Sequence, residues 1–423
     1  MIRILKFEEV NRNEVFARTE PKADVQGIVE DVIRTVRSGG DEALRAYTEK
    51  FDGVRLSSFE VTKEEREEAL QAVGEEFLRV LRRAAANIRK FHQEQKRSGF
   101  ILNEGGIVMG QKVLPLDRVG LYVPGGTAAY PSTVLMDSIP AKIAGVPEVV
   151  MVTPPGKDGK IHPAILAAAE AAGIDRIFKI GGAQAVAALA YGTESVPKVD
   201  KIVGPGNAFV AEAKKQVFGA VAIDMIAGPS EILIVSDGRS DPKVIAADLL
   251  SQAEHDKLAS AVLVTDSMDL AKAVQAELEV QIPKLLRAGI ARESIDRNGK
   301  IIVAEDLKQA FEISNEIAPE HLEVAVDEPF SYLGLIRHAG SVFLGRNTPE
   351  ALGDYLAGPN HTLPTGGTAR FSSPLSVDDF VKKTQYTYFT EEAFQDVAED
   401  VAFFAEREGL TGHAASARVR LEE

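Results

Sequence analysis

Apolar and polar residues recur along the chain at two spacings, and the change of spacing divides the sequence into regions. Within residues 24–97, apolar positions recur about every 3.6 residues, which is typical of amphipathic helices. In "ADVQGIVEDVIRTVRSGG" this pattern stops at two glycines, which we expect to end a first helix. A second helix is predicted from Thr62, where Glu65 completes a capping box, to about Gln95.

From about residue 118, short runs rich in β-branched residues alternate with alanine-rich helical segments. The predicted strands of a first series are "EVVMVTPP", "DRIFKIGG" and "DKIVGPG", and its helices are "PAILAAAEAAG", "AQAVAALAYG" and "NAFVAEAKKQVFG". A second series has the strands "EILIVSD", "SAVLVTD", "KIIVAED", "HLEVAVD" and "SVFLG". This alternation indicates parallel sheets covered by helices. We therefore predict an α/β fold with two Rossmann-like, doubly wound domains and small helical segments at the N- and C-termini.

Composition and charge exclude several classes of protein. The net charge of −15 disfavours nucleic acid as a partner, because phosphates would be repelled. The chain has no cysteine, which excludes disulfides, thiolate metal sites and a cysteine nucleophile. No run of about 18 apolar residues predicts a membrane span, and the N-terminus lacks the apolar region of a signal peptide. We expect a cytoplasmic protein.

Three glycine-rich loops follow predicted strands, where nucleotide-binding proteins hold their ligands. They are "YVPGGTAAYPS", "IGGAQAVAAL" and "VGPGNAF", and none completes the dinucleotide fingerprint G-x-G-x-x-G. Gln184 and Asn207 offer polar side chains to a ligand there, and the ring of Tyr122 could stack on a flat one. Ordinary strand-to-helix turns explain the glycines equally well.

A second group of residues has the chemistry of a metal site. In "DLLSQAEHDK", Gln252 and His255 lie three residues apart and therefore on one face of a predicted helix. A nitrogen and oxygen donor set of this kind suits zinc or a similar divalent ion, although such a pair also caps helix carbonyls. Further polar candidates at glycine-rich breaks are Asp354, His361, Glu408 and His413.

One further pair stands out, because "NEIAPEHLEV" places Glu320 beside His321 where a predicted helix gives way to a strand. Taken alone, this pair also fits a surface loop. Together with "GPGN", "IAGPSEI", "LLSQAEH" and "GDYLAGPNHTLPT", however, "APEHLEV" resembles the histidinol dehydrogenase family. The resemblance runs from about residue 20 to the C-terminus. It implies a zinc- and NAD-dependent enzyme that oxidises L-histidinol through L-histidinal to L-histidine.

The resemblance also implies a role for each candidate residue. Glu320 and His321 match the catalytic pair, and His321 also matches a substrate contact. The residues that match zinc ligands are Gln252, His255, Asp354 and His413, which also contact the substrate; those that match further substrate contacts are Ser230, His361 and Glu408; those that match NAD contacts are Tyr122, Gln184 and Asn207. The family forms homodimers whose C-terminal segment completes the partner's site.

On this basis we expect three regions. A first α/β domain, 25–121 plus 232–375, carries the catalytic residues and zinc, and a second, 122–231, binds NAD. Small helical or tail regions, 1–24 plus 376–423, take part in dimer exchange.

A mechanism follows from the residue types. Neutral imidazole is a suitable base near neutral pH, so we expect His321 to accept a proton as hydride leaves carbon. Because no cysteine is present, hydration of the aldehyde must be direct, and Glu320 is the expected activating carboxylate. The alternatives are an aldehyde dehydrogenase-like enzyme, which the missing cysteine disfavours, a zinc-dependent hydrolase, which would produce no NADH, and a non-catalytic nucleotide sensor.

Overall fold

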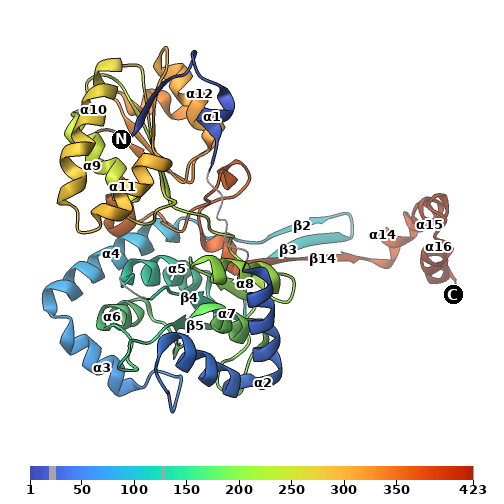
Figure 1. Cartoon of the computed structure of the whole chain (residues 1–423). Coiled ribbons are helices and arrows are strands. Elements are labelled where there is room, and N and C mark those ends of the chain that lie inside the picture. Colours follow the sequence, from blue (N-terminus) through green and yellow to red (C-terminus); the bar gives the residue numbers. More distant parts are fainter. Residues whose placement is uncertain (19–24, 126–128, 423) are drawn as a thin grey trace. The chain divides into compact units, whose positions relative to one another are not determined.

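The computed structural model describes residues 1–18, 25–125 and 129–422, and these residues form two compact units (Figure 1). The first unit comprises Met1–Gln95 and Leu116–Phe380, and the second comprises Lys96–Pro115 and Val381–Glu423. The two units are described separately below.

The first unit contains a six-stranded sheet in the order β1-β11-β10-β9-β12-β13, and all its strand pairs are parallel. Its central strands are buried on both faces: Ile232 and Ile234 pack into one hydrophobic cluster, whereas Leu233 and Val235 pack into another. This alternation is what the two-residue period of a strand requires. The elements of this part are β1 (Arg3–Lys6), α1 (Arg12–Phe16), β9 (Glu231–Ser236), α9 (Pro242–Ala253), β10 (Ser260–Thr265), α10 (Met268–Gln281), α11 (Ala288–Arg297), β11 (Lys300–Val303), α12 (Leu307–Ile317), β12 (His321–Ala325), β13 (Ser341–Leu344) and α13 (Glu350–Leu352).

The same unit contains a five-stranded parallel sheet in the order β6-β5-β4-β7-β8. Helices cover it on both sides (Figure 1), and Val149 and Met151 of β5 point to one cluster while Val150 and Val152 point to the other. Two helix-covered parallel sheets confirm the predicted α/β fold class. The elements are β4 (Arg118–Tyr122), α5 (Pro131–Ala144), β5 (Glu148–Thr153), α6 (Pro163–Ala172), β6 (Arg176–Lys179), α7 (Gly182–Tyr191), β7 (Lys201–Val203), α8 (Ala208–Val217) and β8 (Ala222–Ile223).

Three N-terminal helices, α2 (Gln26–Asp52), α3 (Lys63–Ala72) and α4 (Glu75–Gln93), pack on the five-stranded sheet. Leu44 of α2 lies in the cluster on one face, and Ile88 of α4 lies in the cluster on the other. Their packing therefore differs from the expected grouping of residues 25–121 with the six-stranded sheet. Amphipathic periodicity predicts that a helix has a buried face, but it does not say which sheet covers that face.

Glycines set the ends of these helices. Gly40 has φ 51° and ψ −133° and interrupts α2, as its glycine pair predicts. The capping box of Thr62 and Glu65 is present at the start of α3. The expected single helix from Thr62 to Gln95 is wrong, because Gly74, at φ 76°, separates α3 from α4 in a conformation that favours glycine.

The second unit is an antiparallel sheet in the order β14-β3-β2, followed by three short helices. Gly105 and Gly106, both with positive φ, form the turn between β2 and β3. The terminal regions contain the predicted small helices, and each also contributes a strand: β1 lies within 1–24 and β14 within 376–423. The elements are β2 (Phe100–Glu104), β3 (Ile107–Pro115), β14 (Val381–Phe389), α14 (Glu391–Gln395), α15 (Ala398–Arg407) and α16 (Thr411–Arg418).

Among the described residues, every helix is too short or too polar to span a membrane.

Candidate active site

The pair Glu320–His321 lies where α12 gives way to β12. Ala318, at φ 51°, ends the helix in the left-handed region, and Pro319 prevents it from continuing. His321 is the first residue of β12, which lies between β9 and β13, so the pair is at the amino ends of the parallel strands. Both side chains are buried, with Glu320 7% and His321 4% exposed. A surface loop is therefore excluded.

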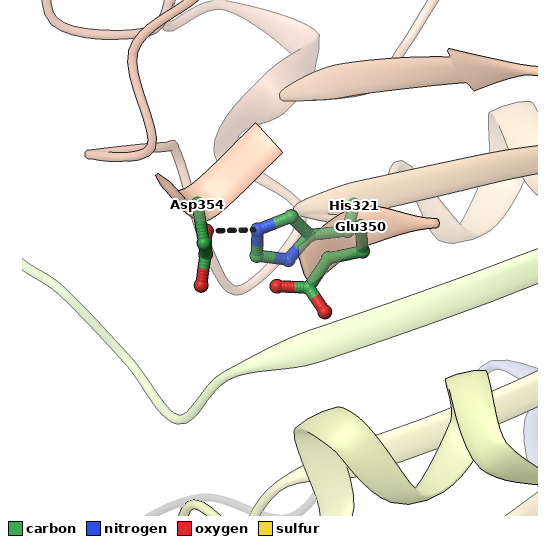
Figure 2. Close-up of side chains that lie close together, drawn as sticks. All are labelled: His321, Glu350 and Asp354. Carbon is green, nitrogen blue, oxygen red and sulfur yellow. Dashed lines mark ion pairs between the residues drawn. The ribbon is translucent and has the colours of Figure 1, made fainter. Parts of the chain in front are cut away.

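The His321 ring is fixed by the backbone of β9. Its Nδ1 lies 2.9 Å from the carbonyl oxygen of Glu231. Because a carbonyl only accepts hydrogen bonds, Nδ1 carries the hydrogen and Nε2 of the neutral ring has the lone pair. Nε2 is buried, lies 4.0 Å from Oδ1 of Asp354 and has no hydrogen-bond partner among the described residues (Figure 2). Burial lowers the pKa of His321 to about 4, although the Asp354 charge opposes this effect.

Glu320 is held by the same residue of β9. Its Oε2 accepts a hydrogen bond of 2.8 Å from the backbone N–H of Glu231 and lies 3.6 Å from Nδ1 of His321. Burial raises the pKa of Glu320 well above its ordinary value, and the nearby Glu231 and Asp354 raise it further. The backbone N–H and carbonyl of one residue of β9, Glu231, thus orient the acid and the imidazole, respectively.

Asp354 and His361 face His321 across a cavity of about 170 Å³, whose lining includes all three residues. Asp354 lies in a π-helical turn, Gly353–Ala357, a local irregularity that is frequent at functional sites. Its Oδ1 is 3.6 Å from Nδ1 of His361. Burial disfavours the Asp354 carboxylate, but His361 and His321 outweigh burial and lower its pKa to about 2. Burial likewise disfavours the charged form of His361, yet Asp354 raises its pKa above the ordinary value.

Gln252 and His255 come from the end of α9. Gln252 is 1% exposed, and neither of its amide atoms has a hydrogen-bond partner among the described residues. The His255 ring is exposed; desolvation by the surrounding protein lowers its pKa, while the charge of Asp354 raises it. Ser230 directly precedes Glu231 at the start of β9. Gln252, His255 and Asp354 together offer one oxygen, one nitrogen and one carboxylate to a cation, a mixed donor set that suits zinc.

Sequence reasoning missed Glu350, which lies in this cluster (Figure 2). The ligand atoms that His321, Glu350 and Asp354 offer lie within 4.8 Å of one another. Glu350 is 2% exposed, and burial raises its pKa to about 8, with Asp354 adding to the effect. Its position four residues before Asp354 was the available signal, since residues at this spacing are neighbours on a helix.

The proposed nucleotide residues lie at the carboxyl ends of strands in the five-stranded sheet. Tyr122 ends β4, and its ring is buried in the core rather than open to stacking; its hydroxyl oxygen accepts a hydrogen bond from the N–H of Gly182. Gln184 is buried in α7. Asn207 is exposed and caps α8 by accepting from the N–H groups of Phe209 and Val210.

The last two candidates belong to the second unit. Glu408 follows the end of α15, His413 lies in α16, and both side chains are exposed. Because Glu408 and His413 lie outside the first unit, its geometry does not test their predicted roles as substrate contact and zinc ligand.

Comparison with known proteins gives a consistent result. The model of the family described as histidinol dehydrogenase matches residues 16–421. The chain is similar to histidinol dehydrogenase of Bacillus cereus, with 57% identity over 400 residues that cover 94% of this chain and 93% of the relative. That of Syntrophotalea carbinolica is 56% identical over 100% of both chains. The crystal structure of histidinol dehydrogenase from Elizabethkingia anophelis superposes with a TM-score of 0.94 and 39% identity, covering 99% of this chain and 97% of the other. The chain belongs to the histidinol dehydrogenase family.

Proposed function

We propose that this chain is a zinc-containing, NAD-dependent dehydrogenase that oxidises L-histidinol through L-histidinal to L-histidine, in the biosynthesis of that amino acid. The observation that carries the proposal is a cluster of buried polar groups in a member of this family: His321, Asp354 and His361 line one cavity, and Glu320 lies 3.6 Å from His321. We extend the proposal to a location in the cytoplasm, where NAD-linked amino-acid biosynthesis takes place.

The polar residues near Asp354 fit a zinc ion. A buried amide without a partner is rare in folded proteins, and the unpartnered oxygen of Gln252 has the chemistry of a cation ligand. Gln252, His255 and Asp354 would hold the ion, together with His413 of the partner subunit. Bound zinc would act as a Lewis acid and as a fixed point that orients the substrate. His361, Ser230 and Glu408 would contact the substrate.

In the first oxidation, His321 accepts the proton of the substrate hydroxyl at Nε2 while hydride passes from carbon to the nicotinamide. The hydrogen bond from Nδ1 to the Glu231 carbonyl supports this role, because it leaves the Nε2 lone pair facing the cavity. The low pKa of His321 keeps the ring neutral at pH 7 and therefore able to accept a proton. The products of this step are the aldehyde, NADH and one proton.

In the second oxidation, Glu320 takes a proton from water as the water oxygen bonds to the aldehyde carbon, and hydride then leaves the hydrate to a second NAD⁺. A base must be ionised, whereas burial raises the pKa of Glu320. A cation held by Gln252 and Asp354 would lower that pKa, because a nearby positive charge favours the carboxylate. The absence of cysteine supports direct hydration over a covalent thiol intermediate.

We assign NAD to the five-stranded sheet and zinc to the six-stranded sheet. In support, the loops after β4, β6 and β7 lie at the carboxyl ends of parallel strands, the usual place for nucleotides in such sheets. Tyr122, Gln184 and Asn207 belong to these loops or to the helices that follow them. With its ring buried, Tyr122 would shape the loop through its hydroxyl group rather than stack on the cofactor.

We further propose a homodimer in which the second unit of each chain packs against the partner subunit. The second unit has a small core, in which the buried residues of its helices are alanines. Many of its large apolar side chains are exposed, and an exposed surface of this kind typically marks an interface. These residues are Phe100, Ile101, Leu102, Met109, Leu114, Tyr388, Val401, Phe403, Phe404, Leu410, Val419 and Leu421.

The test is the stoichiometry of the reaction. Purified protein is incubated with zinc, excess NAD⁺ and limiting L-histidinol, and NADH is followed by absorbance while L-histidine is quantified. The proposal predicts two NADH and one L-histidine for each L-histidinol consumed. One NADH with accumulating aldehyde, or substrate turnover without NADH, as for a hydrolase, would contradict it.

A further inference from the structure

A buried carboxylate next to the proposed zinc site is assigned no role above. Glu350 begins α13, four residues before Asp354, and is 2% exposed. Figure 2 shows its carboxylate beside the His321 ring and Asp354, and their ligand atoms lie within 4.8 Å of one another. Burying a carboxyl group costs free energy unless hydrogen bonds or opposite charges compensate for the lost water.

Glu350 is anchored from two neighbouring elements. The hydroxyl group of Ser251, in α9, donates a hydrogen bond of 2.8 Å to Oε2 of Glu350. The backbone N–H of Glu350 donates a hydrogen bond of 2.7 Å to Oε1 of Glu323, which is buried in the central strand β12. The backbone of Glu350 is thus tied to the sheet and its carboxylate to α9. The residue after Ser251 is Gln252.

The orientation of the Gln252 amide suggests a role for Glu350. Its side-chain amide is buried, and its oxygen and nitrogen are both without partners among the described residues. The two ends of an amide differ chemically: the oxygen binds cations, whereas the NH₂ group only donates hydrogen bonds. A carboxylate on one side would therefore select the orientation that aims the oxygen away from itself. The Gln252 side chain begins one residue after Ser251, whose hydroxyl group contacts the Glu350 carboxyl group.

We propose that Glu350 is a positioning residue for zinc: when Oε1 of Gln252 binds the ion, the carboxyl group of Glu350 accepts a hydrogen bond from Nε2 and holds the amide in that orientation. The inference rests on the zinc site of the proposed function. It gives Ser251 a supporting role, because its hydroxyl group holds the same carboxylate. Residues that orient metal ligands in this way typically change metal affinity by about 10- to 100-fold.

The experiment is a double-mutant cycle read by zinc affinity rather than by activity. Zinc dissociation constants are measured by competition with a chromophoric chelator for the wild type, Glu350→Ala, Gln252→Ala and the double variant. We expect Glu350→Ala to weaken zinc binding by about 10- to 100-fold. If Glu350 acts through Gln252, adding Glu350→Ala to Gln252→Ala produces little further loss. Independent, multiplying losses would overturn the inference.

Two further variants separate positioning from charge and from folding. Glu350→Gln keeps an acceptor oxygen and should bind zinc more tightly than Glu350→Ala; equal weakening would count against the hydrogen bond. Ser251→Ala keeps Glu350 but removes the hydroxyl group that holds its carboxyl group, so we expect a smaller loss of zinc affinity than in Glu350→Ala. When Glu350→Ala is already present, Ser251→Ala should cause no further loss of zinc affinity. Glu254→Gln is the matched charge control, since Glu254 is a carboxylate whose charge acts on His255. The factor by which this variant weakens zinc binding should multiply with the factor for Gln252→Ala in the double variant.

The outcome for the wild type distinguishes the two levels of the argument. If the wild-type protein fails to bind one zinc ion per chain, the zinc site of the proposed function is wrong, and the role of Glu350 fails with it. If the wild type binds zinc and the two losses multiply, only the role of Glu350 is wrong.

Discussion

Replacing Asp137 with asparagine should make the protein more stable at alkaline pH. Asp137 lies in α5 and is fully buried; its Oδ1 accepts a hydrogen bond of 2.7 Å from the hydroxyl group of Thr362, while Oδ2 has no partner among the described residues. Burial raises the pKa of Asp137 to about 7 against an ordinary value of 3.8, and Asp224 adds to this effect, while Thr362, His361 and Lys214 oppose it.

The direction in which stability changes with pH follows from the pKa of Asp137 in the folded and in the unfolded protein. Below about pH 4 the carboxyl group is protonated in both the folded and the unfolded protein. As pH rises from 4 to 7, the unfolded chain loses this proton while the folded chain retains it, so stability falls until the folded pKa of Asp137 is passed. A tenfold change in protonation corresponds to about 1.4 kcal/mol. The difference of about three pKa units therefore removes roughly 4 kcal/mol from the free energy of unfolding. Asparagine cannot ionise, and its amide oxygen still accepts from Thr362.

The assay is urea-induced unfolding of the wild type and Asp137→Asn at pH 5 and at pH 8. The wild type should lose about 2.5 kcal/mol more than the variant between the two pH values, because the unfolded carboxyl group is already largely ionised at pH 5. Asp158→Asn, the same substitution at an exposed aspartate, is the matched control and should follow the wild type. Parallel losses in the wild type and Asp137→Asn would refute the reasoning, because the buried carboxyl group would then not retain its proton.

Three further changes have defined outcomes. Gly204→Ala should destabilise the fold by about 1 to 3 kcal/mol more than the control Gly219→Ala. Both glycines have positive φ, but only at Gly204 would an added Cβ meet backbone, 2.2 Å from the Tyr122 carbonyl oxygen. Equal losses of thermal stability in the two variants would contradict the clash. Glu320→Gln should slow oxidation of supplied L-histidinal by about 10²- to 10⁴-fold and affect oxidation of L-histidinol less, as measured by single-turnover NADH formation, whereas equal losses would refute the division of labour. His255→Asn should lower bound zinc and activity together, and full activity of a metal-free preparation of this variant would exclude the ligand role.

The sequence predicts those features whose signal is local. The strands β9 and β10 are short runs rich in β-branched residues, and a capping box at Thr62 marks the start of a helix, so these elements could be located from a few neighbouring residues. The pairing of β1 with β11 depends instead on residues that lie about 300 positions apart, for which no local pattern exists. The β2–β3 hairpin did leave a signal, two adjacent glycines at 105–106 between apolar runs, which sequence reasoning passed over.

The candidate site shows the same division. His321, Asp354 and His361 were found through short motifs, and the structure brings them to the lining of one cavity. Glu350 was missed because an isolated glutamate is common on helices, and its burial arises only from the packing of α9, α13 and β12. Burial also decides the protonation of Glu320 and His321, which the residue types alone could not indicate.

The central claim, that residues from distant parts of the chain converge on one cation, can be tested by anomalous diffraction at the zinc edge from crystals of the zinc-loaded protein. We predict one peak per chain, at about 2.0 to 2.2 Å from Gln252, His255, Asp354 and His413 of the partner subunit. A peak bound elsewhere, or no peak in a catalytically active crystal, would contradict the account.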